Sequence, residues 1–191
     1  MREALFGNPD EARRLALSAL GLSTAPDVQY AAALALGWRG DAAKAKALAD
    51  DLGRRFPEDT FVNLLYLPML HAEFAITRND GSNAVEVLQA AGSYELGTVQ
   101  LYPAFLRGEA YLSEQRGSEA AAEFQKILDH RGIVLNEPGA LAHLQIGRAY
   151  AMSGESTKAR TAYQDFLTLW KDADPDIPIL KQAKAEYAKL Q

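Results

Sequence analysis

Residues 107–124 read RGEAYLSEQRGSEAAAEF, and residues 146–163 read IGRAYAMSGESTKARTAY. Each stretch holds a glycine, a tyrosine, an alanine and a second aromatic residue at intervals of three, nine and four residues. These residues are Gly108, Tyr111, Ala120 and Phe124 in one stretch, and Gly147, Tyr150, Ala159 and Tyr163 in the other. Because a glycine-containing turn separates the tyrosine from the alanine in both, the pattern indicates a repeated pair of helices.

Close packing explains why small and aromatic residues recur at these intervals. A small residue on each helix of a pair lets the other helix approach, and the aromatic side chains fill the space against the next pair. Two further segments, from about residue 26 and from about residue 65, fit the pattern more loosely. When the four units are aligned on the alanine of the second helix, at positions 45, 84, 120 and 159, the intervals are 39, 36 and 39 residues.

Apolar residues recur at helical spacing through most of the chain, and no segment alternates as a strand does. Turn residues mark the breaks, for example at Gly40-Asp41 and at Asp174-Pro175-Asp176. The pattern predicts an all-α protein with about ten helices, at residues 9–20, 26–39, 41–55, 60–78, 81–91, 99–115, 117–130, 138–153, 155–171 and 176–190. Pro68 either kinks the helix 60–78 or begins a new helix after Leu67.

The composition is that of a folded protein with an acidic surface. Of the 191 residues, 48% are hydrophobic and 24% charged, and the net charge is −5. Basic residues are dispersed among acidic ones, which disfavours nucleic-acid binding. No apolar run is long enough to insert directly into a membrane, and the absence of cysteine excludes disulfides and thiolate metal sites.

The glycine, alanine and aromatic positions described above resemble those of the tetratricopeptide repeat (TPR) family, whose unit is a helix–turn–helix of about 34 residues. The resemblance covers about residues 26–171 and is closest in the last two units. The chain departs from the family pattern because no unit has the early tryptophan and a closing proline is clear only at Pro57. The resemblance implies a right-handed superhelical array, or α-solenoid, of antiparallel helix pairs.

Three regions follow from this resemblance. Residues 1–25 are expected to form an N-terminal helix left from a preceding repeat, and residues 26–175 to form four helix pairs. Residues 176–191 are expected to form a capping helix, because Ile177, Leu180, Ala183, Tyr187 and Leu190 fall on one side of it. The alternative is a detachable helix that occupies a groove in a partner.

Residues 124–130 and 163–175 are also similar to the C-terminal repeat regions of bacterial eukaryotic-like serine/threonine kinases and related signalling proteins. The chain has no glycine-rich phosphate loop, no catalytic Asp/Asn loop and no metal-binding Asp-Phe-Gly motif. The resemblance therefore implies a non-catalytic region, and any kinase activity would lie in a domain outside this chain.

In TPR proteins the first helix of each pair lines the concave face. The resemblance therefore implies a partner-binding groove formed by residues of the first helices. These residues are Tyr30, Leu34 and Trp38; Tyr66, Met69 and Glu73; Tyr102, Phe105 and Glu109; and Leu141, Leu144 and Arg148. Aromatic and methionine side chains give a large contact area at a modest entropic cost. The alternative is that most of these side chains form the core between repeats.

The charges in this groove favour one kind of partner over another. Family members that bind a C-terminal carboxylate use Lys, Asn and Arg here, and Arg148 is the only such residue in this chain's groove. A carboxylate clamp is therefore not expected. Glu73 and Glu109 favour a partner with a basic group, unless both are simply solvated surface acids.

The sequence offers no motif for catalysis, a cofactor or a metal. The histidines, His71, His130 and His143, form no pairing typical of a metal site, and His71 and Glu73 point apart on a helix. No serine, histidine and carboxylate form a nucleophile motif. Residues 154–158 lack the Gly-Lys-Ser/Thr order of a phosphate-binding loop.

Two functions are consistent with these observations. The first is a non-catalytic module that binds a protein or peptide, as the scaffolding or sensing part of a bacterial signalling protein. The second is a homo-oligomerisation module that dimerises an upstream kinase or regulatory domain, so the chain is expected to be a monomer or a homodimer. A pocket enzyme or small-molecule sensor is a third alternative, with no motif in its favour. The compartment stays open, cytoplasmic or, behind an upstream membrane span, periplasmic.

Overall fold

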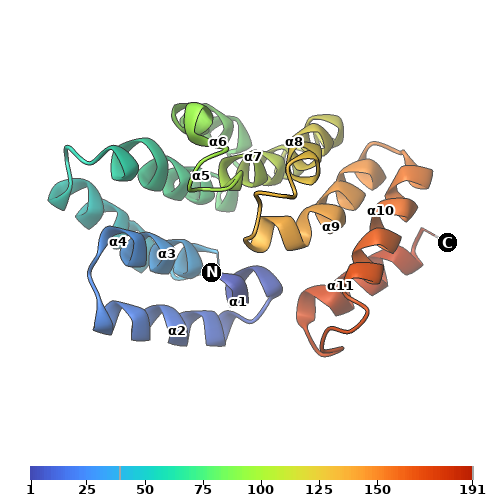
Figure 1. Cartoon of the computed structure of the whole chain (residues 1–191), viewed down its shortest axis with the longest axis horizontal. Helices are drawn as coiled ribbons and strands as arrows, with labels where there is room; N and C mark the ends of the chain where they lie inside the picture. Colours follow the sequence, from blue (N-terminus) through green and yellow to red (C-terminus); the bar gives the residue numbers. More distant parts are fainter. Residues whose placement is uncertain (39, 191) are drawn as a thin grey trace.

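The computed structural model describes residues 1–38 and 40–190, which form a curved array of helices with no strand among them (Figure 1). The α-helices are α1 (Arg2–Phe6), α2 (Pro9–Leu22), α3 (Pro26–Gly37), α4 (Ala42–Arg55), α5 (Leu67–Thr77), α6 (Gly81–Val87), α7 (Tyr102–Ser113), α8 (Gly117–Asp129), α9 (Glu137–Met152), α10 (Ser156–Leu169) and α11 (Pro178–Ala188). A π-helical segment η1 (Val62–Tyr66) precedes α5, and a 3-10 segment η2 (Leu88–Tyr94) follows α6.

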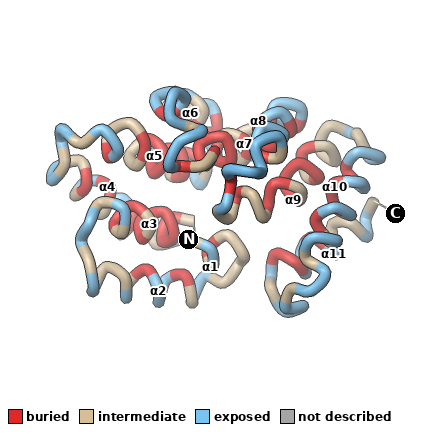
Figure 2. The backbone as a smooth tube through the Cα atoms, viewed as in Figure 1, coloured by how far each residue is buried: buried red, intermediate tan, exposed pale blue. Residues whose placement is uncertain are grey.

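The expected all-α array of helix pairs is confirmed. Helix α3 packs against α4, α5 against α6, α7 against α8 and α9 against α10, and the first helices of neighbouring pairs also contact each other. Residues in α3, α5, α7 and α9 are the most deeply buried along the array (Figure 2). The first helix of each pair therefore faces the inside of the stack. The last residue predicted for the helix 26–39 lies outside the described residues.

The turn inside each helix pair has the same backbone conformation at the same repeat position. Gly40, Asn79, Gln115 and Gly154 have positive φ angles of 96°, 57°, 61° and 77°. Each lies five residues before the alanine on which the units were aligned, so the turns repeat at the same intervals as the alanines. A left-handed residue ends a helix and reverses the chain, and glycine adopts this conformation without a steric penalty.

Replacement of Gln115 by glycine is expected to stabilise the protein. Gln115 adopts a left-handed conformation that costs a residue with a Cβ roughly 1 kcal/mol. Thermal and urea unfolding of Gln115→Gly should show a gain of about 0.5–1 kcal/mol. The matched change Gly154→Ala, at the same position of the next unit, should lose a similar amount. A loss of stability in Gln115→Gly would contradict the shared turn geometry.

The two strongest sequence repeats pack as their intervals predict. A methyl group on Gly108 would lie 2.5 Å from the ring of Phe124, and one on Gly147 would lie 3.1 Å from the ring of Tyr163. Both glycines therefore allow an aromatic ring of the second helix to lie directly on the backbone of the first. The aligned alanines of these units, Ala120 and Ala159, have no exposed surface.

Pro68 lies in a continuous helical segment that widens just before it. The N–H of Leu67 donates to the carbonyl of Val62, a π-helical bond that spans five residues. Proline lacks an N–H, and its ring would clash with a carbonyl four residues earlier in a regular α-helix. The π-helical turn relieves this clash, so the helix neither stops nor begins anew at the proline.

Both ends of the array differ in detail from the sequence-based expectation. Residues 1–25 hold two helices, α1 and α2, where one was predicted, and α2 packs against α3. Helix α1 lies between the two ends of the curved array and contacts α11 (Figure 1). Phe6 packs edge-on against Trp170 with ring centroids 5.0 Å apart, and a methyl group on Gly7 would lie 2.8 Å from Pro178.

Helix α11 covers the last helix pair as a capping helix does. Its residues Ile179, Leu180 and Ala183 are buried, and Ile177 and Tyr187 pack against the same core. Within the described residues, no helix is long and apolar enough to cross a bilayer.

Candidate functional site

Most of the residues predicted for a groove lie between packed helices. Tyr30, Leu34, Met69, Glu73, Tyr102, Phe105, Leu141 and Leu144 are buried, whereas Trp38, Tyr66, Glu109 and Arg148 are half-buried. Trp38 reaches from α3 to α7, where its ring centroid lies 6.1 Å from that of Tyr102 and 6.4 Å from that of Phe105. A fully buried side chain has no surface to offer a partner. The candidate site therefore narrows to those residues that line an open pocket, and partner contact by the others stays a prediction.

Three tyrosines from successive repeats line one pocket of about 220 Å³. Tyr30 belongs to α3, Tyr66 to η1 and Tyr102 to α7, and 36 residues separate each from the next. The three tyrosines meet because the first helices of successive pairs pack side by side. We call this cavity the tyrosine pocket; it is lined by Met1, Asp27, Tyr30, Ala31, Tyr66, Thr98, Val99, Tyr102 and Asn136.

The tyrosine rings are held in fixed positions. Tyr30 and Tyr66 stack with centroids 4.4 Å apart and an angle of 9° between the rings, and the Tyr30 hydroxyl lies 3.5 Å from the sulfur of Met69. Tyr102 is 3% exposed, and its hydroxyl has no hydrogen-bond partner among the described residues. Burial raises the pKa of Tyr30 and Tyr102 well above the usual value, so both hydroxyls stay protonated and able to donate.

Two loops complete the tyrosine pocket, and the sequence patterns did not identify them. The turn between η2 and α7 supplies Thr98 and Val99, and Asn136 comes from the N-cap of α9. Leu135 donates its backbone N–H to the Gln100 side chain at 3.0 Å, which ties the two loops together. Arg107 bonds to Glu95 in the turn and to Glu123 in α8, the latter at 2.8 Å. These hydrogen bonds hold the two loops to each other and to helices α7 and α8.

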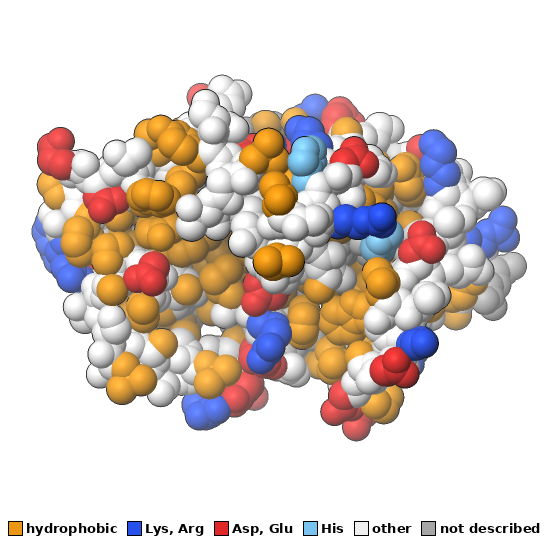
Figure 3. Space-filling model, viewed as in Figure 1, with side chains coloured by type: hydrophobic (Ala, Val, Ile, Leu, Met, Phe, Trp, Pro, Cys, Tyr) orange, Lys and Arg blue, Asp and Glu red, His pale blue; other side chains and the backbone are white. Residues whose placement is uncertain are grey.

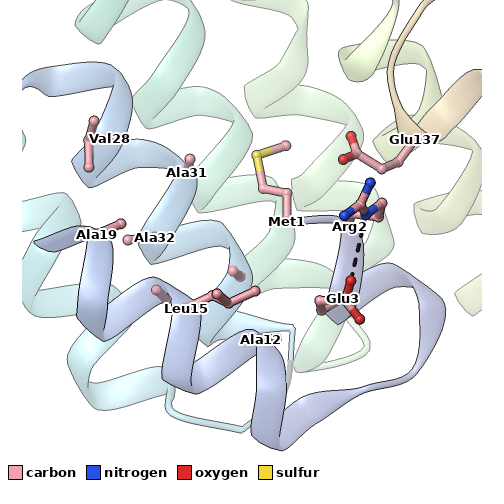
Figure 4. Close-up of a pocket in the computed structure, with 12 residues that line it drawn as sticks. Met1, Arg2, Glu3, Ala12, Leu15, Ala19, Val28, Ala31, Ala32 and Glu137 are labelled. Atoms are coloured by element: carbon pink, nitrogen blue, oxygen red, sulfur yellow. Dashed lines mark ion pairs between the residues drawn. The ribbon is translucent and has the colours of Figure 1, made fainter.

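A second pocket of about 400 Å³ adjoins the first and lies between α1, α2 and α3. Figure 4 shows that alanines and Val28 line one side of this alanine pocket, and that Arg2 lies between the carboxylates of Glu3 and Glu137. Arg2 pairs with Glu3 at 3.6 Å. Met1 and Ala31 line both pockets, so the two form one continuous groove. The surface is hollowed beside α1, and hydrophobic side chains surround the hollow (Figure 3).

Two acids, the buried Glu73 and the half-buried Glu109, lie on the first helices seven residues after Tyr66 and Tyr102. Glu73 has no exposed surface. Among the described residues, neither of its carboxyl oxygens has a hydrogen-bond partner, and one oxygen of Glu109 also lacks one. Burial raises the pKa of Glu73 to about 8 and that of Glu109 to about 7. A methyl group on Gly37 would lie 2.4 Å from Glu73, so this glycine makes room for the carboxylate.

Arg148, the one basic residue predicted for the groove, is engaged by the capping helix. Its guanidinium bonds to Glu186 at 2.8 Å and to Gln145 at 3.1 Å, and the Tyr163 hydroxyl donates to the same Glu186. Although burial opposes it, these hydrogen bonds lower the pKa of Glu186. Arg148 therefore holds α11 in place.

The histidines lie apart from the tyrosine pocket. Burial lowers the pKa of His71 and of His143, which favours their neutral forms. Among the residues that the structure describes, no three His, Asp or Glu side chains lie close enough to share a metal ion.

The fold and the groove define an all-helical repeat protein of the α-solenoid kind. No protein-family model matches the chain, and no curated protein and no solved structure matches it either.

Proposed function

We propose that this chain is a non-catalytic, tetratricopeptide-like module that binds a segment of a partner protein. The observation that carries the proposal is the tyrosine pocket, an open hollow on the inner side of the array to which three successive repeats each contribute one aromatic residue. The adjoining alanine pocket extends it into a groove long enough for several residues of a peptide. Resemblance to TPR proteins supports the same surface for binding.

The proposed mechanism is recognition by a surface formed before the partner arrives. The rings of Tyr30 and Tyr66 are stacked, and the loops that carry Thr98 and Asn136 are tied to each other. Because the groove is already ordered, most of the entropy lost on binding is lost by the peptide. In the parent protein the module would act as a scaffold or sensor for signalling.

Peptide display against the isolated chain tests the proposal. Peptides selected from a random library should lose at least tenfold in affinity when Tyr66 is changed to alanine, since Tyr66 is half-buried and contributes accessible ring surface to the pocket. The matched control is Tyr150→Ala, a half-buried tyrosine that lines a different hollow near Lys158. Circular dichroism should show both variants folded. Selected peptides that are indifferent to Tyr66 would contradict the proposal.

Self-association is a second candidate, supported by an exposed apolar surface that adjoins the tyrosine pocket at Thr98. Phe61, Tyr94 and Leu96 are 49%, 41% and 58% exposed and line a hollow of about 290 Å³. Exposed apolar patches often mark interfaces between proteins. Light scattering distinguishes the two candidates: a dimer that Leu96→Asp dissociates supports self-association, and a monomer at every concentration removes it.

A further inference from the structure

Buried oxygens without a partner gather on the inner side of the array. Within the described residues, the buried side-chain polar atoms that lack a hydrogen-bond partner belong to Glu73, Tyr102, Glu109 and Asn136, and every one is an oxygen. Tyr102 and Asn136 line the tyrosine pocket. A buried polar atom without a partner is costly, so these oxygens favour a ligand that supplies hydrogen-bond donors.

Among the described residues that line the tyrosine pocket, the one charged side chain is acidic. Asp27 is exposed and lines the tyrosine pocket, and Glu137 lines the adjoining alanine pocket. The pKa of Tyr102 is raised by burial first, then by Tyr30 and by the carboxyl group of Glu137, which places Glu137 within electrostatic range of the pocket. Among the described residues that line it, none has a basic side chain. The potential in the pocket therefore favours a cation.

The basic side chains of Arg2 and Arg148 are paired with acids and do not line the tyrosine pocket. Arg2 pairs with Glu3 and lines the alanine pocket, not the tyrosine pocket. The amino group of Met1 has its pKa lowered by burial, with Glu137 and Glu3 opposing the shift. Arg148 bonds to Glu186 of the capping helix. The aromatic rings add to the preference for a cation, because the face of a tyrosine ring attracts positive charge.

We infer that the tyrosine pocket accepts a basic side chain, the ammonium group of a lysine or the guanidinium group of an arginine, from the partner segment. Such a group carries three to five donors and no acceptor, which matches the unpartnered oxygens of Tyr102 and Asn136. Its charge matches Asp27 in the pocket and Glu137 in the adjoining alanine pocket, and its alkyl stem can pack against the aromatic rings that line the pocket. The inference rests on the proposed binding function and specifies the chemistry of the partner at one position.

Capped single amino acids test the inference without a known partner. N-acetyl-lysine methylamide and N-acetyl-arginine methylamide are titrated into the full chain, with the norleucine and citrulline analogues as neutral probes of matched shape. NMR of ring-labelled tyrosines follows Tyr30, Tyr66 and Tyr102. One of the two cations should shift these signals with an affinity about tenfold higher than that of its neutral analogue. Equal binding of the neutral and charged probes would overturn the inference.

Two conservative variants locate the cation. Tyr102→Phe removes a hydroxyl that has no partner, so it leaves the fold intact, and Asp27→Asn removes an exposed charge. Each should weaken cation binding several-fold, whereas Tyr150→Phe, outside the pocket, should not change it. Binding unaffected by both variants would place the cation elsewhere and overturn the inference. Binding of free spermidine but of neither amino-acid probe would also overturn it, because the source would then be a free polyamine.

The outcomes separate this inference from the proposed function. The display experiment could select peptides whose affinity depends on Tyr66 but that need no Lys or Arg. That result would support the binding function and reject the inference that the pocket accepts a basic side chain. If no peptide binds the chain in the display experiment, the proposed binding function itself is rejected.

Discussion

Gly108→Ala is expected to destabilise the protein by about 2 kcal/mol, because the added methyl group overpacks the contact between the helices of one pair. The new methyl would lie 2.5 Å from two atoms of the Phe124 ring, which is fully buried and cannot move into solvent. The cost of overpacking exceeds the gain of up to about 1 kcal/mol that alanine brings to a helix. Urea unfolding monitored by circular dichroism measures the difference.

Two other glycines and one double variant provide the controls. Gly147→Ala places its methyl 3.1 Å from Tyr163 and should cost less than Gly108→Ala, and Gly21→Ala meets no atom within 4 Å and should be neutral or stabilising. Gly108→Ala combined with Phe124→Leu should be less destabilised than the sum of the two single changes, because the smaller side chain relieves the clash. Equal effects of all three alanine substitutions would contradict the close packing of helix on helix.

Stability should fall as the pH rises from 5 to 8, mainly because of Glu73 and Glu109. Their folded-state pKa values of about 8 and about 7 lie above the ordinary value of 4.5. In this interval the folded state therefore holds protons that the unfolded state releases, and the free energy of unfolding decreases with pH. The stabilisation that comes from the protonated Glu73 and Glu109 is fully present below about pH 4.5. It is lost as the pH rises through the folded-state pKa values of the two groups. At about 1.4 kcal/mol per pH unit for each group, these values correspond to a loss of up to about 7 kcal/mol between pH 5 and 8.

Glutamine variants assign this slope to the two acids. Glu73→Gln together with Glu109→Gln keeps the side-chain shape and removes both titrating groups, so it should flatten the profile and exceed the parent chain in stability at pH 8. The control is Glu86→Gln, an exposed acid on α6, which should leave the profile unchanged. Urea unfolding at intervals of pH gives both curves. A parent chain whose stability rises between pH 5 and 8 would show that the buried acids are ionised and partnered.

The sequence predicted the array because the information is local and repeated. Gly108 and Phe124 are 16 residues apart, and their contact recurs as Gly147 and Tyr163 at the same spacing. Because the same residue types recur at the same spacing in both units, each unit supports the interpretation of the other. The left-handed turns repeat with the alanines for the same reason.

The missed features depend on contacts between distant parts of the chain. Helix α1 has only five residues, too few to be stable alone, and it forms because Ala4 and Phe6 pack against the array. Asn136 and Thr98 reach the tyrosine pocket through loops, where no periodicity marks them.

The sequence alone also did not distinguish residues that line a groove from residues that are buried in the core. Tyr66 and Tyr102 occupy equivalent positions, each 18 residues before the aligned alanine, yet Tyr66 is half-buried and Tyr102 is 3% exposed beside Trp38. The difference arises because Trp38 crosses from α3 to α7 and covers the middle of the inner face.

The central claim is that the first helices of successive helix pairs pack side by side and so bring together aromatic residues that are distant in the sequence. Nuclear Overhauser effects between ring protons of selectively labelled aromatic residues test it directly. The account predicts strong cross-peaks between Tyr30 and Tyr66, whose rings are 4.4 Å apart, and weaker ones between Trp38 and Tyr102, at 6.1 Å. A folded chain that shows neither would have its helix pairs out of register, and the tyrosine pocket would not exist.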